Sequence, residues 1–108
     1  MFELEFSKTT NKDINSAHKY IKEKLEAPMA AENLKKELLE KLEYLKEKPY
    51  SRPLVQDKFL ASLGIRSINV KNYSIFYKIK EEENHVVVVR FMYSKRDWIN
   101  ILKNNIEI

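Results

Sequence analysis

Hydrophobic positions in the first half of the chain follow two different periods. Phe2, Leu4 and Phe6 alternate with polar residues, the period of two that predicts a half-buried strand. A period near 3.6 then occurs twice and predicts two helices, which a short break at residues 26–28 joins into an antiparallel hairpin. Pro28 suits the first turn of the second helix. The apolar positions are Ile14, Ala17, Ile21 and Leu25 in the first helix and Ala30, Ala31, Leu34, Leu38, Leu42 and Leu45 in the second.

Polar residues around these two helices fit the same interpretation. We expect Thr9, Thr10 or Asn11 to cap the first helix. Oppositely charged residues at three- and four-residue spacing cover the outer face of the second helix, where each pair contributes only about 0.2–0.5 kcal/mol. That charge run is therefore interpreted as a solvated face. His18 borders the first apolar stripe without an acid nearby, which favours a structural or solvent-facing role.

The second half of the chain predicts three strands. Pro49 and Pro53 prevent a continued helix between them. The only glycine, Gly64, is expected to make a positive-φ turn before the first of these strands. Patterns with a period of two predict strands around Ile68 and Val70 and over residues 73–80. A polar hairpin connection over residues 80–84 leads to a third strand over residues 86–93.

The strand predicted over residues 86–93 differs from the others because it begins with four consecutive valines. Such a run predicts a central strand covered on both faces, since a strand covered on one face alternates more clearly. Asp97 can cap a short helix over residues 98–103. The predicted order is β-α-α-β-β-β, an α+β fold in one domain over residues 1–108.

Composition limits the possible chemistry. A chain of 108 residues that is 44% hydrophobic fits one compact domain. The absence of cysteine excludes disulfides, thiol nucleophiles and thiolate metal sites, and it suits a reducing cytoplasm. His18 and His85 are too far apart in sequence for a local metal site, so we expect neither a metal nor another cofactor. Without a signal-like or membrane-spanning run, the protein is expected to be soluble and cytoplasmic and to make no membrane contact.

Positive charge is concentrated in the second half of the sequence. Lysines and acids balance over residues 1–48, so the whole net charge of +4 comes from residues 49–108. That half also contains every arginine of the chain, and arginine is well suited to binding phosphate or carboxylate. The arginines are Arg52, Arg66, Arg90 and Arg96.

Common catalytic motifs are missing from the sequence. A single glycine rules out glycine-rich nucleotide loops, and there is no nucleophile elbow or recognisable catalytic triad. The three acids at residues 81–83 are interpreted as a solvated hairpin turn, not as a catalytic carboxylate pair.

A basic and aromatic segment remains as the candidate site. Arg90 interrupts an apolar strand, so it must reach solvent, a ligand or an acid such as Asp97 or Asp57. Tyr93 and Arg96 follow at the end of that strand, where they can stack a base and bind phosphate. The alternative is structural: Tyr93 and Trp98 are core or rim aromatics, and Arg96 pairs with Asp97 or with a carboxylate elsewhere.

Four segments resemble the RelE/ParE superfamily of bacterial toxins from type II toxin–antitoxin modules: DINSAHKYI, PMAAENLKKELLEKLEYL, GIRSINVKNYSIFYKI and VVVVRFMYSKRDW. The last two are the most specific. The resemblance implies a helical hairpin packed on a small, mainly antiparallel sheet, in agreement with the predicted order. It also implies a growth-arresting toxin that a cognate antitoxin neutralises and with which it can form a hetero-oligomer.

Two mechanisms divide that superfamily. RelE-like members are ribosome-dependent, metal-independent mRNA endonucleases, and ParE-like members inhibit DNA gyrase. For a nuclease, the resemblance implies Arg90, Tyr93 and Arg96 as the catalytic residues. The implied binding residues are Arg66, Lys71, Tyr73, Lys78, Lys95 and Trp98.

Departures from the nuclease pattern favour the gyrase interpretation. Ser74 stands where the RelE-like branch carries an arginine, and Ser67 and Asn69 stand where basic residues are common. Inhibition of gyrase needs a surface that binds the enzyme and needs no catalytic residues, so it tolerates these changes. Two alternatives remain, a ribosome-dependent nuclease and a toxin-fold protein that acts only as a binding partner.

Overall fold

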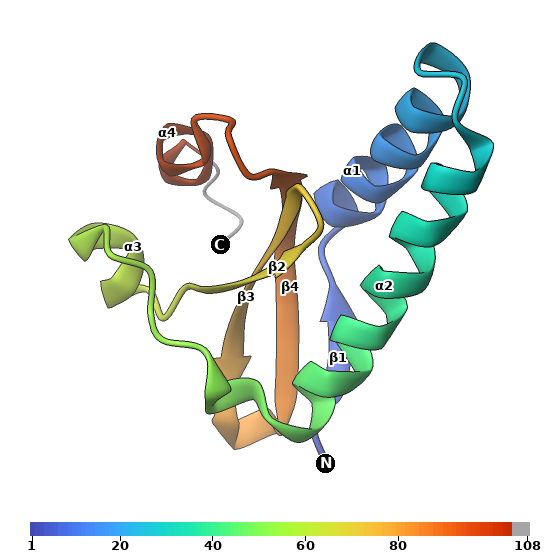
Figure 1. The fold of residues 1–108 in the computed structure, drawn as a ribbon. Coiled ribbons are helices and arrows are strands. Elements are labelled where there is room, and N and C mark those ends of the chain that lie inside the picture. The colour runs from blue at the N-terminus through green and yellow to red at the C-terminus, as the bar shows by residue number, and fades with distance from the viewer. Residues whose placement is uncertain (105–108) are drawn as a thin grey trace.

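The computed structural model describes residues 1–104 and shows the predicted order of helices and strands with additional short helical segments (Figure 1). The strands are β1 (Glu3–Phe6), β2 (Arg66–Val70), β3 (Tyr73–Lys80) and β4 (His85–Tyr93). The helices are α1 (Lys8–Lys19), α2 (Pro28–Glu47), α3 (Lys58–Ser62) and α4 (Trp98–Lys103). A π-helical segment (Tyr20–Lys24) follows α1, and 3-10 turns cover Pro49–Ser51 and Glu81–Glu83.

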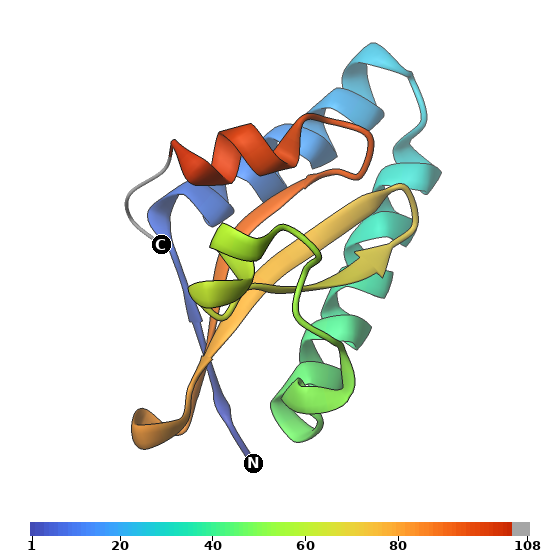
Figure 2. The ribbon, with the colours of Figure 1, turned by 90° about the vertical axis from the view of Figure 1, so that its left-hand side faces the viewer.

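The four strands form one sheet in the order β1-β4-β3-β2. The β1–β4 pair is parallel, and the other two pairs are antiparallel. The α1–α2 hairpin covers one face of the sheet, and the short helices α3 and α4 lie on the other (Figures 1 and 2). The expected α+β fold, with a helical hairpin on a mainly antiparallel sheet, is therefore confirmed.

Strand β4 is central, as its valines predicted, and contributes to a core on each face. Val86, Val88 and Phe91 pack with the leucines of α2 and with the alternating residues of β3. Val89 and Met92 face the other core, which α3 and α4 close with Leu60 and Leu102. The register of β3 against β4 shifts by one residue here. Tyr77 pairs with Val88 and the preceding Phe76 pairs with Arg90, so Val89 has no partner on β3. Such a bulge changes which side chains face each core.

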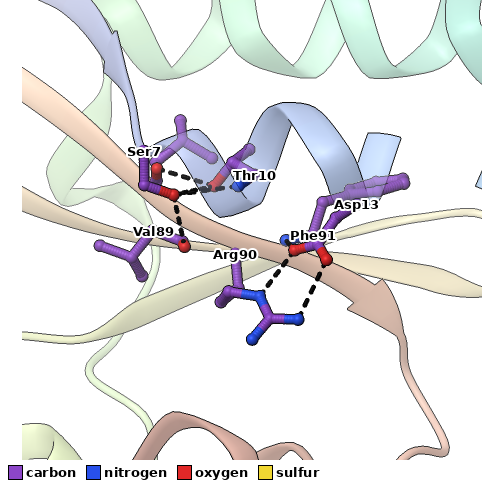
Figure 3. Close-up of polar contacts among 7 residues, drawn as sticks. Ser7, Thr10, Asp13, Val89, Arg90 and Phe91 are labelled. Atoms are coloured by element: carbon purple, nitrogen blue, oxygen red, sulfur yellow. Dashed lines mark hydrogen bonds and ion pairs between the residues drawn. The ribbon is translucent and has the colours of Figure 1, made fainter. Parts of the chain in front are cut away.

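Side chains of α1 continue the hydrogen bonding of the β4 edge after β1 ends. Figure 3 shows Ser7, whose hydroxyl donates to the Val89 carbonyl at 2.9 Å. The buried Thr10 hydroxyl donates to the Val88 carbonyl at 3.0 Å. One carboxylate oxygen of Asp13 accepts from the Phe91 N–H at 3.1 Å. Three side chains thus replace a strand partner that β1 is too short to provide.

The same contacts correct the predicted helix cap. Ser7, and not Thr9, Thr10 or Asn11, is the N-cap of α1, and its hydroxyl accepts from the Thr10 N–H at 3.0 Å. Thr10 lies instead on the buried side of the first turn, against β4.

Arg90 has a partner that sequence inspection did not identify. Its Nε and Nη2 donate to the two oxygens of Asp13 at 2.7 and 3.0 Å, and about one eighth of each side chain remains exposed (Figure 3). The expected partners are wrong. Asp57 caps α3 and pairs with Lys103 at 3.0 Å, whereas Asp97 accepts from the Asn100 side-chain amide at 2.7 Å.

The predicted turns are confirmed. Gly64 has a φ of +83°, and Asn84 ends the 81–83 turn with a φ of +57°. At the tip of the helical hairpin, Glu26 adopts a φ of +49°, which is uncommon for a residue other than glycine. His18 contacts Glu32 of α2 at 3.2 Å, an acid distant in sequence that the hairpin brings close. No helix within residues 1–104 is both long and apolar enough to cross a bilayer.

Tyr77 connects β3 to the end of α2. Its side chain is fully buried, and its hydroxyl donates to the Pro49 carbonyl at 2.8 Å. Burial raises the pKa of Tyr77 to about 12.

Replacing Asp13 with alanine should be strongly destabilising. The change leaves the mostly buried Arg90 unpaired and the Phe91 N–H without an acceptor, which we expect to lower the free energy of unfolding by about 3 kcal/mol. Urea denaturation measures this. Glu32→Ala, which breaks the exposed contact with His18, is the control and should cost less than about 1 kcal/mol. Equal losses in the two variants would show that the Asp13 contacts do not stabilise the fold.

Tyr77→Phe should change how stability depends on pH. The unfolded chain releases the phenol proton near pH 10 and the folded chain near pH 12, so the wild type loses stability as pH rises between those values. By pH 11 this loss should be about 1.4 kcal/mol, and the phenylalanine variant should lack it. Guanidinium unfolding of both proteins at pH 8 and pH 11 tests the difference. A difference in unfolding free energy between the two proteins that is the same at pH 8 and pH 11 would contradict a pKa of Tyr77 raised by burial.

Candidate functional site

A groove of about 600 Å³ opens at the end of the sheet where β3 begins and β4 ends. The tip of the helical hairpin forms one side, and the strand ends form the other. The lining residues are Tyr20, Ile21, Leu25, Asn72, Tyr73, Tyr93 and Arg96. Its position follows from the sheet register, because Tyr73 is paired directly with Tyr93.

The groove floor is a packed set of aromatic rings. Tyr73 stacks on Phe91 with centroids 5.0 Å apart and planes within 6° of parallel, and the edge of Tyr93 meets Tyr73 at 5.7 Å. Burial, and next the nearby phenols of Tyr20 and Tyr93, raise the pKa of Tyr73 above its usual value. Tyr93 itself remains 39% exposed. The rings thus provide a rigid surface with phenolic hydroxyls, suited to protein contacts or base stacking.

Arg96 is the cation of this groove. Lys95 and Arg96 are both exposed in the turn after β4, and the Arg96 N–H donates to the Tyr93 carbonyl at 3.0 Å. No carboxylate of residues 1–104 lies within ion-pair distance of Arg96, so the expected alternative pairing with Asp97 is wrong. The guanidinium is therefore available for an anionic partner.

Ser74 lies beneath this turn and is buried. Its hydroxyl donates to the Asn69 side-chain oxygen at 3.1 Å and lies 2.8 Å from the Ser94 hydroxyl. These contacts connect β2, β3 and the turn after β4. A side chain at this position points into the protein, where an arginine would have to displace them.

The other expected binding residues lie away from the groove. Arg66 sits over the Tyr50 ring at 5.4 Å and donates to the Arg52 carbonyl. Lys71 is held against Glu37 of α2 through its backbone N–H and its ammonium group. The structure therefore assigns both residues contacts with other parts of the fold.

Lys78 and Trp98 occupy the opposite side of the sheet from the hairpin. Lys78 is half-buried on β3 and paired in register with Val87. Trp98 packs on Phe76 at 5.0 Å and lines a separate hollow of about 320 Å³. The structure thus brings together Tyr73, Tyr93 and Arg96, with Lys95 beside them, and not the complete set expected from sequence.

Sequence inspection missed the helical side of the groove. Leu25 was expected in the apolar stripe of the first helix but is 56% exposed, because the π-helical segment changes the rotation of the chain before it. Tyr20 is 52% exposed and lies outside that stripe. A large aromatic residue off the apolar face at a helix end was the available signal for a contact surface.

The groove lining combines phenolic, cationic and apolar groups. Phenols, one arginine and apolar side chains line it, and they include neither a carboxylate nor a histidine. Within the part of the chain that the structure describes, no three His, Asp or Glu side chains gather as metal ligands.

The chain is similar to known toxins in sequence and in fold. The family model for the ParE toxin of the type II toxin–antitoxin system parDE matches residues 4–98. Comparison with curated protein sequences gives no significant match.

Solved structures of related toxins share the fold. A chain of the chromosomal ParDE system from P. aeruginosa superposes with a TM-score of 0.70 at 13% identity, covering 88% of this chain and 98% of the other. The isolated E. coli RelE toxin gives a TM-score of 0.56 at 18% identity, covering 95% and 97%. A chain of the RelBE2 toxin–antitoxin complex from Mycobacterium tuberculosis gives 0.55 at 20% identity, covering 85% and 96%. With the family match over residues 4–98, these observations establish that the chain belongs to the ParE toxin family of type II toxin–antitoxin systems.

Proposed function

We propose that this toxin arrests bacterial growth by binding and inhibiting DNA gyrase. The main support is that one residue expected for nuclease chemistry, Arg90, is engaged within the fold, and that a second basic position is replaced by a buried serine. Asp13 neutralises Arg90, and Ser74 is buried where the nuclease branch carries an arginine. RNA cleavage without a metal needs groups that remove a proton, protonate the leaving oxygen and stabilise the phosphoryl charge.

The groove has the features of the protein-binding surface that such inhibition requires. Rigid aromatic residues and arginine are the side chains that most often dominate protein interfaces. Tyr93 and Arg96 offer this combination in a groove that is also bordered by the exposed Leu25. The partner surface would supply apolar side chains and a carboxylate for Arg96.

A cognate antitoxin is the second proposed partner, and it would bind in the cytoplasm. Two of the solved relatives come from toxin–antitoxin systems described as ParDE and RelBE2. An acidic, partly apolar antitoxin segment would complement both the charge and the apolar lining of the same groove.

Ribosome-dependent mRNA cleavage is the alternative function. Tyr93 and Arg96 are exposed together, so a phenol and a guanidinium could approach a phosphate at the strand end. An inactive, binding-only protein is the other alternative, which predicts no effect on growth.

Side-by-side assays with purified protein separate these functions. We expect inhibition of gyrase supercoiling and no efficient mRNA cleavage in a ribosome-programmed translation reaction, because the groove lacks a complete acid–base set. Site-specific cleavage in the ribosomal A site would reverse this assignment. Expression in bacteria without an antitoxin should stop growth, and normal growth at confirmed soluble expression would favour the inactive alternative.

Arg96→Ala should weaken gyrase inhibition about tenfold or more, since truncating an interface arginine often costs about 1–2 kcal/mol of binding. Its side chain makes no ion pair within residues 1–104, so the melting temperature should stay close to that of the wild type. Lys35→Ala on α2 is the exposed control and should retain full inhibition.

Arg90→Ala should also reduce toxicity, but with a lower melting temperature because it leaves Asp13 unpaired. Thermal unfolding alongside the gyrase assay distinguishes the two effects. Equal inhibition by the Arg90→Ala, Arg96→Ala and Lys35→Ala variants would show that neither arginine takes part in the inhibition.

A further inference from the structure

The outward face of α1 carries a row of unpaired lysines. Lys8, Lys12 and Lys19 recur at helical spacing, and Lys22 follows in the π-helical segment. All four are exposed, and none makes an ion pair within residues 1–104. The core-facing residues of α1 lie on the opposite side of the helix. The row extends about 17 Å from Lys8 to Lys19 alone.

Few acids accompany these lysines. Residues 8–24 contain five lysines and two acids, a net charge of +3. Of the two acids, Asp13 is engaged by Arg90 from β4, and Glu23 lies exposed beside Lys22 in the π-helical segment. The acids of β1, Glu3 and Glu5, face His85 at 3.6 and 3.3 Å. A half of the chain that is balanced as a whole therefore contains a positive helical segment.

Helix α2 provides an internal comparison. It has four lysines and five glutamates, so its exposed side is mixed in charge. Solubility alone requires no segregation of this kind, and mixed signs are the ordinary arrangement of a solvated surface. The contrast between two neighbouring helices indicates an anionic partner for α1.

The composition of the lysine row specifies the kind of anion. The lysine ammonium group is a compact point charge that suits phosphate. It lacks the planar guanidinium with which arginine makes two hydrogen bonds to one base edge. Proteins that bind single-stranded nucleic acid usually stack bases on aromatic rings. Tyr20 is the one aromatic residue between Lys8 and Lys22, and its side chain lines the groove at the strand ends. A row of charges along one exposed helical face can instead contact several phosphates along the backbone of a duplex.

We infer that the α1 row of Lys8, Lys12, Lys19 and Lys22 binds the phosphate backbone of duplex DNA without sequence preference. The inference rests on the proposed function for the source of that DNA, which is the duplex that gyrase holds. Contact with both the enzyme and its DNA would add the two binding energies through one rigid toxin.

A charge-removal experiment with a matched control tests this inference. The α1 variant is Lys12→Gln, Lys19→Gln and Lys22→Gln, and the control on α2 is Lys35→Gln, Lys36→Gln and Lys41→Gln. Both remove three lysine charges, all of them exposed except the half-buried Lys41 of the control, and glutamine retains helix propensity. Fluorescence anisotropy with labelled 20-base-pair DNA duplexes of two sequences, and with an RNA duplex, is measured over 50–200 mM KCl. Circular dichroism confirms that both variants are folded.

The wild type should bind both DNA sequences equally, with affinity falling about 100-fold across that salt range, as expected for four phosphate contacts. The α1 variant should bind about tenfold or more weakly and reduce the slope of log K against log salt by about 2.7, whereas the α2 control should match the wild type.

Three results would overturn the inference: equal losses in the two variants, an unchanged salt slope in the α1 variant, or tighter binding to the RNA duplex. The DNA measurement does not involve gyrase. A wild type that binds DNA as expected but fails to inhibit supercoiling would therefore overturn the proposed function and leave the α1 assignment intact.

Discussion

The unpaired edge of β4 is the constraint on which much of this fold depends. β1 pairs with β4 only as far as Val88, so the backbone groups beyond that point need other partners. Ser7 and Asp13 supply them for the Val89 carbonyl and the Phe91 N–H. Thr10 adds a second bond to the Val88 carbonyl, which also accepts from the Ser7 backbone N–H. Because buried backbone groups without partners are costly, these three bonds fix where α1 lies. The position of α1 in turn sets the place of α2 and of the hairpin tip that forms one side of the groove.

Asp13 accepts hydrogen bonds from both the Phe91 N–H and the Arg90 guanidinium, and this double role has consequences for function. An arginine in the middle of a sheet would be a natural candidate for phosphate chemistry, but here a carboxylate holds it with two hydrogen bonds. The same pair removes an acid from the surface of α1. One interaction therefore weakens the case for a nuclease and engages one of the two acids of residues 8–24, the segment that carries the lysine row.

The groove at the strand ends has a different origin, in the register of β3 against β4. That register pairs Tyr73 with Tyr93, and the turn after β4 then brings Arg96 beside them. The π-helical end of α1 exposes Tyr20 and Leu25 on the facing side. Apolar residues exposed together in this way form a contact surface more readily than a reaction centre.

The sequence alone determined the order of the elements, the central position of β4, the turns at Gly64 and residues 81–84, and the toxin family. These follow from local periodicity, from glycine chemistry and from two specific segments, and each depends on residues that are close in the chain. It did not indicate α3, the Ser7 cap or the Asp13–Arg90 pair. Asp13 and Arg90 are 77 positions apart, and only the packing of α1 against β4 brings them together. Ser7 and Asp57 cap α1 and α3 through local bonds to residues three positions on, which the hydrophobic pattern does not reveal. The excess of lysine in residues 8–24 is likewise present in the sequence, but its placement on one exposed face depends on α1 packing its other face against the sheet.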